Sequence, residues 1–224
     1  MDTKLSIRLK YIASFVSKDM IIGDIGSDHG YLPYYLLNND IVSFIYASDN
    51  KKGPYNNLCN TLKSFNDKCE IGLKNGLDGL PSYVNTLTIT GMGGDLIISI
   101  LENGKEYLKN IDNMILSPQQ NIEGVRRYLN SIGYKIVKEG IVFDDKYYNV
   151  LLIGKGKQVL TDIEYKYGKY LLENKDETFI DYLMFQRQYY LRILALETID
   201  EAKRTLLNDN INELDDIIGD YYGF

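Results

Sequence analysis

The chain is predicted to fold as an α/β protein with a helical arm, on the basis of three features of its sequence. Strand-like and helix-like segments alternate from residue 20 to residue 132, which is typical of a parallel, doubly wound sheet with helices on both faces. Two strand-like segments then follow with no helix between them, so they must pair as an antiparallel hairpin. After Gly154-Lys155-Gly156-Lys157 the pattern is wholly helical. A parallel sheet that finishes with a hairpin is a variant of the Rossmann-like plan.

The individual elements follow from local periodicity and from the residues that bound each segment. Leu5, Leu9, Ile12 and Val16 recur at helical spacing and predict an amphipathic first helix. Short apolar segments bounded by Gly, Pro, Asn or Asp are typical of strands. Strands are expected at 20–25, 42–48, 69–73, 84–89 and 113–116, and the hairpin at 134–143 and 147–153. The intervening helices are expected at 34–38, 54–65, 95–108 and 122–132.

The C-terminal segment is expected to form a separate helical arm, with domains at 1–157 and 158–224. Thr161 and Glu164 have capping-box spacing and predict a helix to about Asn174. Residues 176 to about 207 carry an apolar seam without Pro or Gly, which predicts one long helix before a short closing helix at 211–218. The arm is either a helical hairpin or coiled coil, or a tail that packs back on the sheet, and the sequence favours neither.

Composition and charge are typical of a globular protein with an acidic C-terminal segment. The chain has 224 residues, 45% of them apolar, and a net charge of −6, which suits a soluble globular protein. Residues 1–158 hold 18 basic and 17 acidic side chains, whereas residues 159–224 hold 7 and 14. The acidic tail is either a solvated helical surface or a charge arrangement that orients a polyanion on the other domain.

No metal site and no membrane segment are expected. The two cysteines lack metal-ligand spacing and the chain has a single histidine. The apolar runs are too short to span a bilayer, and residues 1–5 do not have the layout of a signal peptide. We therefore expect a cytoplasmic protein.

The stretch from Asp24 to Pro33 lies between a predicted strand and a predicted helix and indicates a ligand cradle. Its glycines allow close backbone approach, and the helix N-terminus offers free N–H groups. Asp24 and Asp28 would repel a pyrophosphate, but they would attract a ribose or a ligand that carries a sulfonium and an ammonium. The stretch therefore indicates a nucleoside or S-adenosylmethionine rather than a dinucleotide, whose G-x-G-x-x-G pattern is absent. The candidate cofactor-binding residues here are Asp24, Gly26, Ser27, Asp28, His29, Tyr31, Leu32 and Pro33.

Polar or glycine-rich turns follow the other predicted strands. Asp49 is placed to bind two ribose hydroxyls, and Gly91-Met92-Gly93-Gly94 allows a flat ligand to approach. Ser117-Pro118-Gln119-Gln120-Asn121 either reads a base edge or caps the next helix. His29 is expected to support its loop by hydrogen bonding rather than to act as a base. These turns add Asp49, Asn50, Asn75, Gly76, Gly91, Met92 and Gly93 as candidate cofactor-binding residues, and Ser117, Gln119 and Asn121 join Asp28 as candidate catalytic residues.

Three strings, Asp24–Pro33, Gly53-Pro54 and Thr90–Gly94, together resemble the bacterial tRNA adenine-22 N1-methyltransferases. The segments 5–9 and 148–151 are also similar to that family, so the resemblance covers essentially residues 1–155. It implies a Rossmann-like class I methyltransferase sheet with a C-terminal coiled-coil arm, S-adenosylmethionine as cofactor and tRNA as substrate. The chain departs from the family in Ser117-Pro118-Gln119, where Gln-Pro-Asn is common, and in the residues that follow Asp49.

The resemblance also implies a mechanism, in which N1 of adenine accepts the methyl group. Catalysis then depends mainly on alignment of the nucleophile with the methyl group. Asp28 would stabilise positive charge or accept a proton, Ser117, Gln119 and Asn121 would orient the adenine, and Asp24, Gly26, Asp49 and Asn75 would hold the cofactor. Lys4, Arg8, Lys10, Arg126 and Arg127 are candidate cations for tRNA.

Other functions remain open at this point. The protein could be a methyltransferase for a small molecule or protein, or a non-catalytic nucleoside-binding module whose arm recruits a partner. An NAD oxidoreductase is disfavoured by the acidic glycine turn. We expect a monomer or weak dimer.

Overall fold

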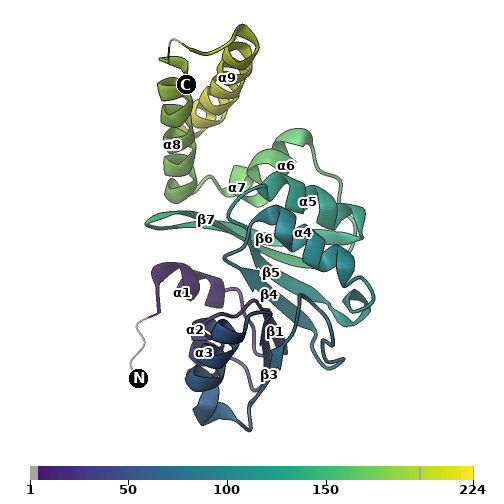
Figure 1. Cartoon of the computed structure of the whole chain (residues 1–224). Helices are drawn as coiled ribbons and strands as arrows, with labels where there is room; N and C mark the ends of the chain where they lie inside the picture. The colour runs from purple at the N-terminus through teal and green to yellow at the C-terminus, as the bar shows by residue number, and fades with distance from the viewer. Residues whose placement is uncertain (1–4, 197, 224) are drawn as a thin grey trace. The chain divides into compact units, whose positions relative to one another are not determined.

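The computed structural model describes residues 5–196 and 198–223 and divides into two compact units, residues 1–168 and 169–224. The first unit is built on a seven-stranded sheet with the order β3-β2-β1-β4-β5-β7-β6 (Figure 1). Strands β1 to β5 are parallel, and β7 runs antiparallel to both of its neighbours. The predicted fold class is therefore confirmed. The strands are β1 (Ile22–Ile25), β2 (Ile45–Asp49), β3 (Cys69–Leu73), β4 (Thr86–Thr90), β5 (Asn113–Ser117), β6 (Tyr134–Asp144) and β7 (Lys146–Lys155).

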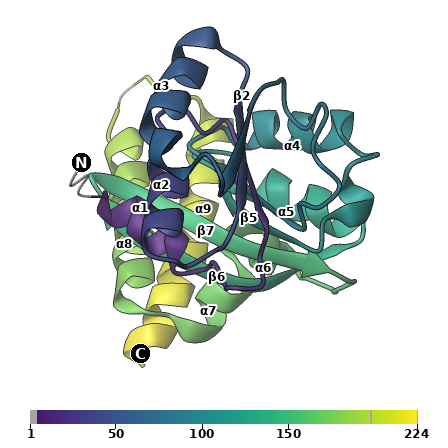
Figure 2. The same ribbon diagram turned by 90° about the horizontal axis from the view of Figure 1, so that it is seen from below.

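Helices cover both faces of this sheet (Figures 1 and 2). One face carries α1 (Ile7–Ala13), α2 (Tyr31–Asn38) and α3 (Lys52–Leu62), and the other carries α4 (Gly94–Asn103) and α5 (Ile122–Ser131). The first three helices bury apolar side chains against β1, β2 and β5, and Ile12, Leu36 and Leu58 are fully buried there. Burial of an aliphatic side chain of this size contributes about 1.5–3 kcal/mol. This core fixes the carboxyl ends of the central strands.

Helices α2 and α4 differ from their predicted bounds for local reasons. Helix α2 begins at Tyr31, three residues before the expected start, because Gly30 adopts a left-handed N-cap conformation and Pro33 is tolerated in the first turn. Helix α4 ends at Asn103, where Gly104 forms the C-cap. Short 3-10 helices occupy Lys63–Phe65 and Leu108–Asn110.

The first unit ends with α6 (Asp162–Tyr167), which contacts α5. The predicted capping box of Thr161 and Glu164 is confirmed. The expectation of one helix to Asn174 is wrong, because Gly168 has a φ of +100° and separates α6 from α7 (Lys169–Asn174). The contacts divide the chain after Gly168, eleven residues beyond the domain boundary that the composition indicated, because α6 belongs with the sheet.

The second unit consists of α7, α8 (Glu177–Leu194) and α9 (Glu201–Tyr222). The expected long helix from 176 to 207 is wrong, because a new helix starts when the Asp200 side chain accepts a hydrogen bond from the Lys203 N–H at 2.8 Å. Helices α8 and α9 pack together, and Arg187 of α8 pairs with Asp215 of α9. The short connection makes this pair a helical hairpin.

Candidate functional site

Two adjoining pockets lie at the carboxyl edge of the sheet, beyond β1, β2 and β4. The first has a volume of about 390 Å³ and lies near Asp49 and Asn75. The second has a volume of about 370 Å³ and lies near Asp24, His29 and Gln119. Gly26, Asp28 and Met92 line both pockets. Ligands of parallel α/β sheets bind at this edge, so the pockets form one candidate site with two compartments.

Asp24 is a buried carboxylate at the end of β1. Its two oxygens accept hydrogen bonds from the Ser27 and Thr88 hydroxyls, each at 2.5 Å, and the residue is 5% exposed. Burial raises the pKa of Asp24 despite these hydrogen bonds, because a desolvated carboxylate loses the stabilisation of water. A cationic group of a ligand in the second pocket would favour the ionised form.

The turn after β1 is pinned to β2 and carries unusual backbone geometry. The N–H groups of Gly26 and Ser27 both donate to the Ser48 carbonyl, at 2.8 and 2.9 Å. Gly26 has a φ of +73°, and a Cβ at this position would collide with the Met92 methyl group. Asp28 also has a positive φ, +48°, which Asp tolerates better than most residues. The turn therefore places Asp28 where it lines both pockets.

His29 and Tyr31 form a stacked pair at the second pocket. Their ring centroids lie 5.2 Å apart at an interplanar angle of 13°. The His29 Nε2 atom is 3.6 Å from a carboxylate oxygen of Asp28, and both side chains are half exposed. The pair offers flat surface and hydrogen-bonding capacity at the wall of the second pocket.

Asp49 ends β2 and faces the first pocket. It is 8% exposed, and its oxygens accept hydrogen bonds from the backbone N–H groups of Lys51 at 2.9 Å and Asp28 at 3.3 Å. Asn50 and Asn75, which also line this pocket, are joined through their side-chain amides at 3.3 Å. The remaining lone pairs of the carboxylate can accept hydrogen bonds from vicinal hydroxyls of a ligand.

The loops after β4 and β5 contact each other directly. The Gln119 N–H donates to the Met92 carbonyl at 2.9 Å, and the Gly94 N–H donates to the Gln120 carbonyl at the same distance. A Cβ at Gly94 would lie 2.5 Å from the Gln120 carbonyl oxygen. The glycines of this motif therefore serve close packing of two loops as well as access to the pocket.

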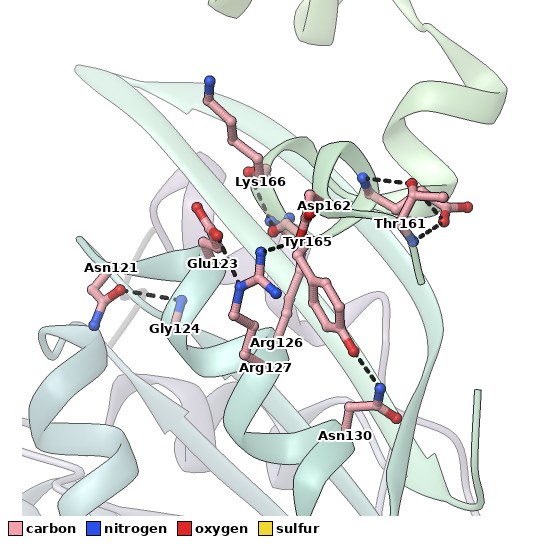
Figure 3. A network of polar contacts seen from close by, with 11 residues as sticks. Asn121, Glu123, Gly124, Arg126, Arg127, Asn130, Thr161, Asp162, Tyr165 and Lys166 are labelled. Carbon is pink, nitrogen blue, oxygen red and sulfur yellow. Dashed lines mark hydrogen bonds and ion pairs between the residues drawn. The ribbon is translucent and has the colours of Figure 1, made fainter. Parts of the chain in front are cut away.

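Ser117 and Asn121 lie outside both pockets. The Ser117 hydroxyl is fully buried and has no hydrogen-bond partner among the residues that the structure describes. Asn121 is the N-cap of α5, and its side-chain oxygen accepts from the Gly124 N–H at 3.1 Å (Figure 3). Its amide nitrogen donates to Asp95. This is the helix-cap role that the sequence left open. Of the three candidate residues in this loop, Gln119 alone lines a pocket.

Most of the residues predicted from sequence meet in the two pockets. Those that line neither pocket are Pro33, Gly93, Ser117 and Asn121. Sequence reasoning missed an apolar wall made by Leu96 and Ile100 of α4 in the first pocket, although their i, i+4 spacing on the helix after the glycine motif was visible. It also missed Lys51 and Lys74 in the first pocket and Leu9 in the second.

Two neighbouring arginines that were candidate tRNA contacts lie away from the pockets. Arg126 is 1% exposed; its Nε donates to Glu139 at 2.6 Å, and its terminal nitrogens donate to the Tyr165, Lys166 and Tyr167 carbonyls at 3.0 to 3.5 Å. This guanidinium holds the last turn of α6 and cannot contact a substrate, so the expectation for it is wrong. Arg127 pairs with Glu123 at 2.9 Å and with Asp162 at 2.7 Å (Figure 3).

The other candidate cations differ in position. Arg8 lines the second pocket and Lys10 is exposed on α1, whereas Lys4 lies outside the described residues. In residues 5–196 and 198–223 no group of three or more His, Cys, Asp or Glu side chains could hold a metal ion. Among those same residues no helix is long and apolar enough to span a bilayer.

Comparison with known proteins shows what the chain is similar to. A family profile for a methyltransferase domain matches residues 5–151. The tRNA (adenine(22)-N(1))-methyltransferase of Bacillus subtilis is 34% identical over 160 residues, which cover 69% of this chain and 67% of that protein.

Solved structures extend the similarity to the whole chain. The Streptococcus pneumoniae protein Sp1610 in complex with S-adenosyl-L-methionine superimposes with a TM-score of 0.88 and 30% identity, over 96% of this chain and 99% of that chain. M. capricolum TrmK in complex with S-adenosyl-homocysteine gives a TM-score of 0.84 and 28% identity, over 96% and 97% of the two chains.

Proposed function

Because this chain belongs to the family of tRNA (adenine(22)-N(1))-methyltransferases, we propose that it methylates N1 of adenine 22 in tRNA with S-adenosylmethionine as methyl donor. The observation that carries the proposal is the pair of pockets joined at Gly26, Asp28 and Met92. A methyl transfer needs a donor compartment and an acceptor compartment that meet at the reacting atoms. These three residues form that meeting point.

The donor set of the first pocket fits the adenosine half of S-adenosylmethionine. The Asp49 carboxylate is buried at a strand end and suits a bidentate hydrogen bond to ribose hydroxyls. Leu96 and Ile100 supply an apolar wall for the adenine ring, and Asn75 supplies an amide for its edge. Gly26 keeps open the space that a Cβ would fill.

Asp24 fits the methionine half. An ammonium group stabilises the charge of a desolvated carboxylate such as Asp24. Asp24 lines the second pocket, so the methionine half would reach past the shared residues into the compartment that also receives the target base. Arg8, which lines the same pocket, can pair with a carboxylate or a phosphate of a ligand there. The charges of the pocket therefore match both a cationic and an anionic group.

S-adenosylmethionine supplies a methyl group activated by a sulfonium, and N1 of adenine supplies the lone pair. Asp28 is the candidate catalytic residue, because it is a carboxylic acid that lines both pockets. It stabilises the positive charge that the adenine ring acquires, or it accepts the N6 proton. Gln119 is placed to orient the base through its amide, and the His29–Tyr31 pair offers a face for it.

The target adenine must leave its base pair or stack before its N1 can be reached. Residues 169–224 hold 12 acidic and 6 basic side chains, so their net charge repels phosphate. Two candidate cations remain on α1: Arg8, which lines the second pocket, and Lys10, which is exposed.

Mass spectrometry of nucleosides tests the proposal directly. Purified protein incubated with S-adenosylmethionine and unmodified tRNA should produce N1-methyladenosine, which should be absent when adenine 22 is replaced by guanine. Asp28→Asn should lower kcat by about 100-fold or more, as for a general acid–base residue, with little change in cofactor affinity. Binding of the cofactor without any methyl transfer would instead identify a nucleoside-binding module.

A further inference from the structure

The hairpin of β6 and β7 extends past the end of the rest of the sheet on the side of the two pockets. Pairing of β5 with β7 stops at Leu116 and Leu151, whereas pairing of β6 with β7 continues to Asp144 and Lys146. Five residues of β7 therefore stand beyond β5, which at about 3.3 Å per residue is an extension of about 16 Å. Figure 1 shows this projecting end of the hairpin beyond α1.

The projecting end is held firmly to α1, next to the second pocket. The Arg8 N–H donates to the Asp144 carboxylate at 3.0 Å, and the Arg8 guanidinium lies 4.8 Å from the centre of the Tyr148 ring. Arg8 itself lines the second pocket. At Gly140 a Cβ would collide with the Tyr11 hydroxyl of α1. The tip therefore contacts a residue that lines the second pocket, Arg8, and it is not a free loop.

An aromatic ring and a cation are exposed at this tip. Phe143 is 53% exposed, and its ring meets that of its cross-strand partner Tyr147 at 5.0 Å and 63°. The Lys146 ammonium lies 5.1 Å from the centre of the Tyr148 ring. The two acids of the turn are engaged: Asp144 accepts from Arg8, and Asp145 accepts from the Tyr148 hydroxyl at 3.0 Å.

We propose that Phe143 is a stacking platform for a nucleotide that flanks the target adenine, with Lys146 contacting its phosphate. The inference rests on the proposed function. Extrusion of an adenine leaves a neighbouring base without a stacking partner, and an exposed aromatic ring accepts any base face. Lys146 of the tip and Arg8 of α1 balance the charges of Asp144 and Asp145, so stacking rather than long-range attraction dominates the contribution of the tip.

Four variants of the full chain test the platform. Phe143→Leu keeps the apolar volume and removes the π face, Phe143→Tyr keeps the ring, and Lys146→Gln removes the cation. Val137→Ala is the matched control, because Val137 is 43% exposed on the same strand at the opposite end of the hairpin. Each variant is compared with the wild type for tRNA binding at several salt concentrations, for cofactor binding by calorimetry, and for methylation kinetics.

Phe143→Leu should raise the tRNA Kd and KM about 5- to 100-fold at every salt concentration, with an unchanged cofactor Kd. Phe143→Tyr and Val137→Ala should stay within about twofold of the wild type. Lys146→Gln should lower the slope of log Kd against log salt by about 1. A 2-aminopurine beside adenine 22 should be quenched by the wild type and by Phe143→Tyr but not by Phe143→Leu.

The inference is overturned if Phe143→Leu binds and quenches like the wild type. It is also overturned if the loss of binding accompanies a change of sedimentation coefficient, which would identify Phe143 as a contact between copies of the chain. If the protein methylates tRNA and no variant at residue 143 changes binding or rate, only the stacking role of Phe143 is refuted. If tRNA binding depends on the ring but no methylation occurs, the proposed function is refuted and the stacking role stands. A wild type that binds no tRNA refutes both.

Discussion

Replacement of Arg126 by Met tests whether the buried guanidinium is a structural clamp. Met preserves much of the aliphatic volume but leaves the Glu139 carboxylate, which is 1% exposed, without its 2.6 Å partner. It also removes the donors for three carbonyls of α6. Removal of one member of a buried ion pair costs about 3–5 kcal/mol. In a chain of this size that lowers Tm by about 6–20 °C.

The neighbouring arginine provides the control, since it has the same side chain in a different setting. Arg127 pairs with Glu123 and Asp162, and all three side chains are at least two-fifths exposed. Arg127→Met should therefore change the stability little, because an exposed ion pair is screened by water, and it should shift Tm by no more than about 4 °C. Thermal unfolding followed by circular dichroism at fixed pH and salt compares the two variants.

A double variant separates charge from hydrogen bonding at this clamp. Arg126→Met combined with Glu139→Leu also removes the carboxylate that has lost its arginine, so part of the lost stability should return. The part that does not return reflects the lost hydrogen bonds from the guanidinium to the three carbonyls and the altered packing. Equal Tm values for the Arg126 and Arg127 single variants would refute the reasoning.

Three further predictions concern the pockets. Asp49→Ala should weaken S-adenosylmethionine binding about 10- to 100-fold in calorimetry, since it removes a charged acceptor of ribose hydroxyls, and an unchanged Kd would place the ribose elsewhere. Burial raises the pKa of Asp24, so the free protein should gain stability as pH falls from that raised pKa toward the ordinary value of about 3.9. Cofactor affinity should fall over the same range, and Asp24→Asn should abolish both trends in melting and titration series. Gly26→Ala should destabilise the protein and weaken cofactor binding, because Gly26 has a φ of +73° and faces the Met92 methyl group. Gly133→Ala is the control, because Gly133 has a φ of +87° and open space around it. This control should cost only the backbone strain of about 1–2 kcal/mol and leave cofactor affinity unchanged.

The sheet could be predicted because its determinants are local. Short apolar segments separated by Gly, Asn and Asp define the strands, and the lack of a helix between 143 and 147 defines the hairpin. The carboxylates Asp24 and Asp49 sit at strand ends, so the alternation alone places them at one edge of the sheet. The alternation of strands and helices and the position of carboxylates at strand ends therefore predict most of the candidate site.

The features that sequence reasoning missed depend on capping and on contacts between distant segments. The break between α8 and α9 is made by the side chain of Asp200, which a search for Pro and Gly does not detect. Arg8 reaches the second pocket because α1 packs on β6, more than a hundred residues away. Arg126 and Arg127 are adjacent in sequence but point about 100° apart on α5, so one is buried and the other faces solvent.

The contact between the loops after β4 and β5 has a consequence for how substrate preference can evolve. Gly94 fits against the Gln120 carbonyl, and Gln119 is bonded to Met92, which borders both pockets. A substitution in residues 118–121 that moves this loop therefore also moves Met92, a wall of both pockets. The loops after β4 and β5 must therefore change together when the protein evolves to accept a different base. Variants that exchange only one of the two loops between relatives should lose cofactor affinity before they acquire a new specificity.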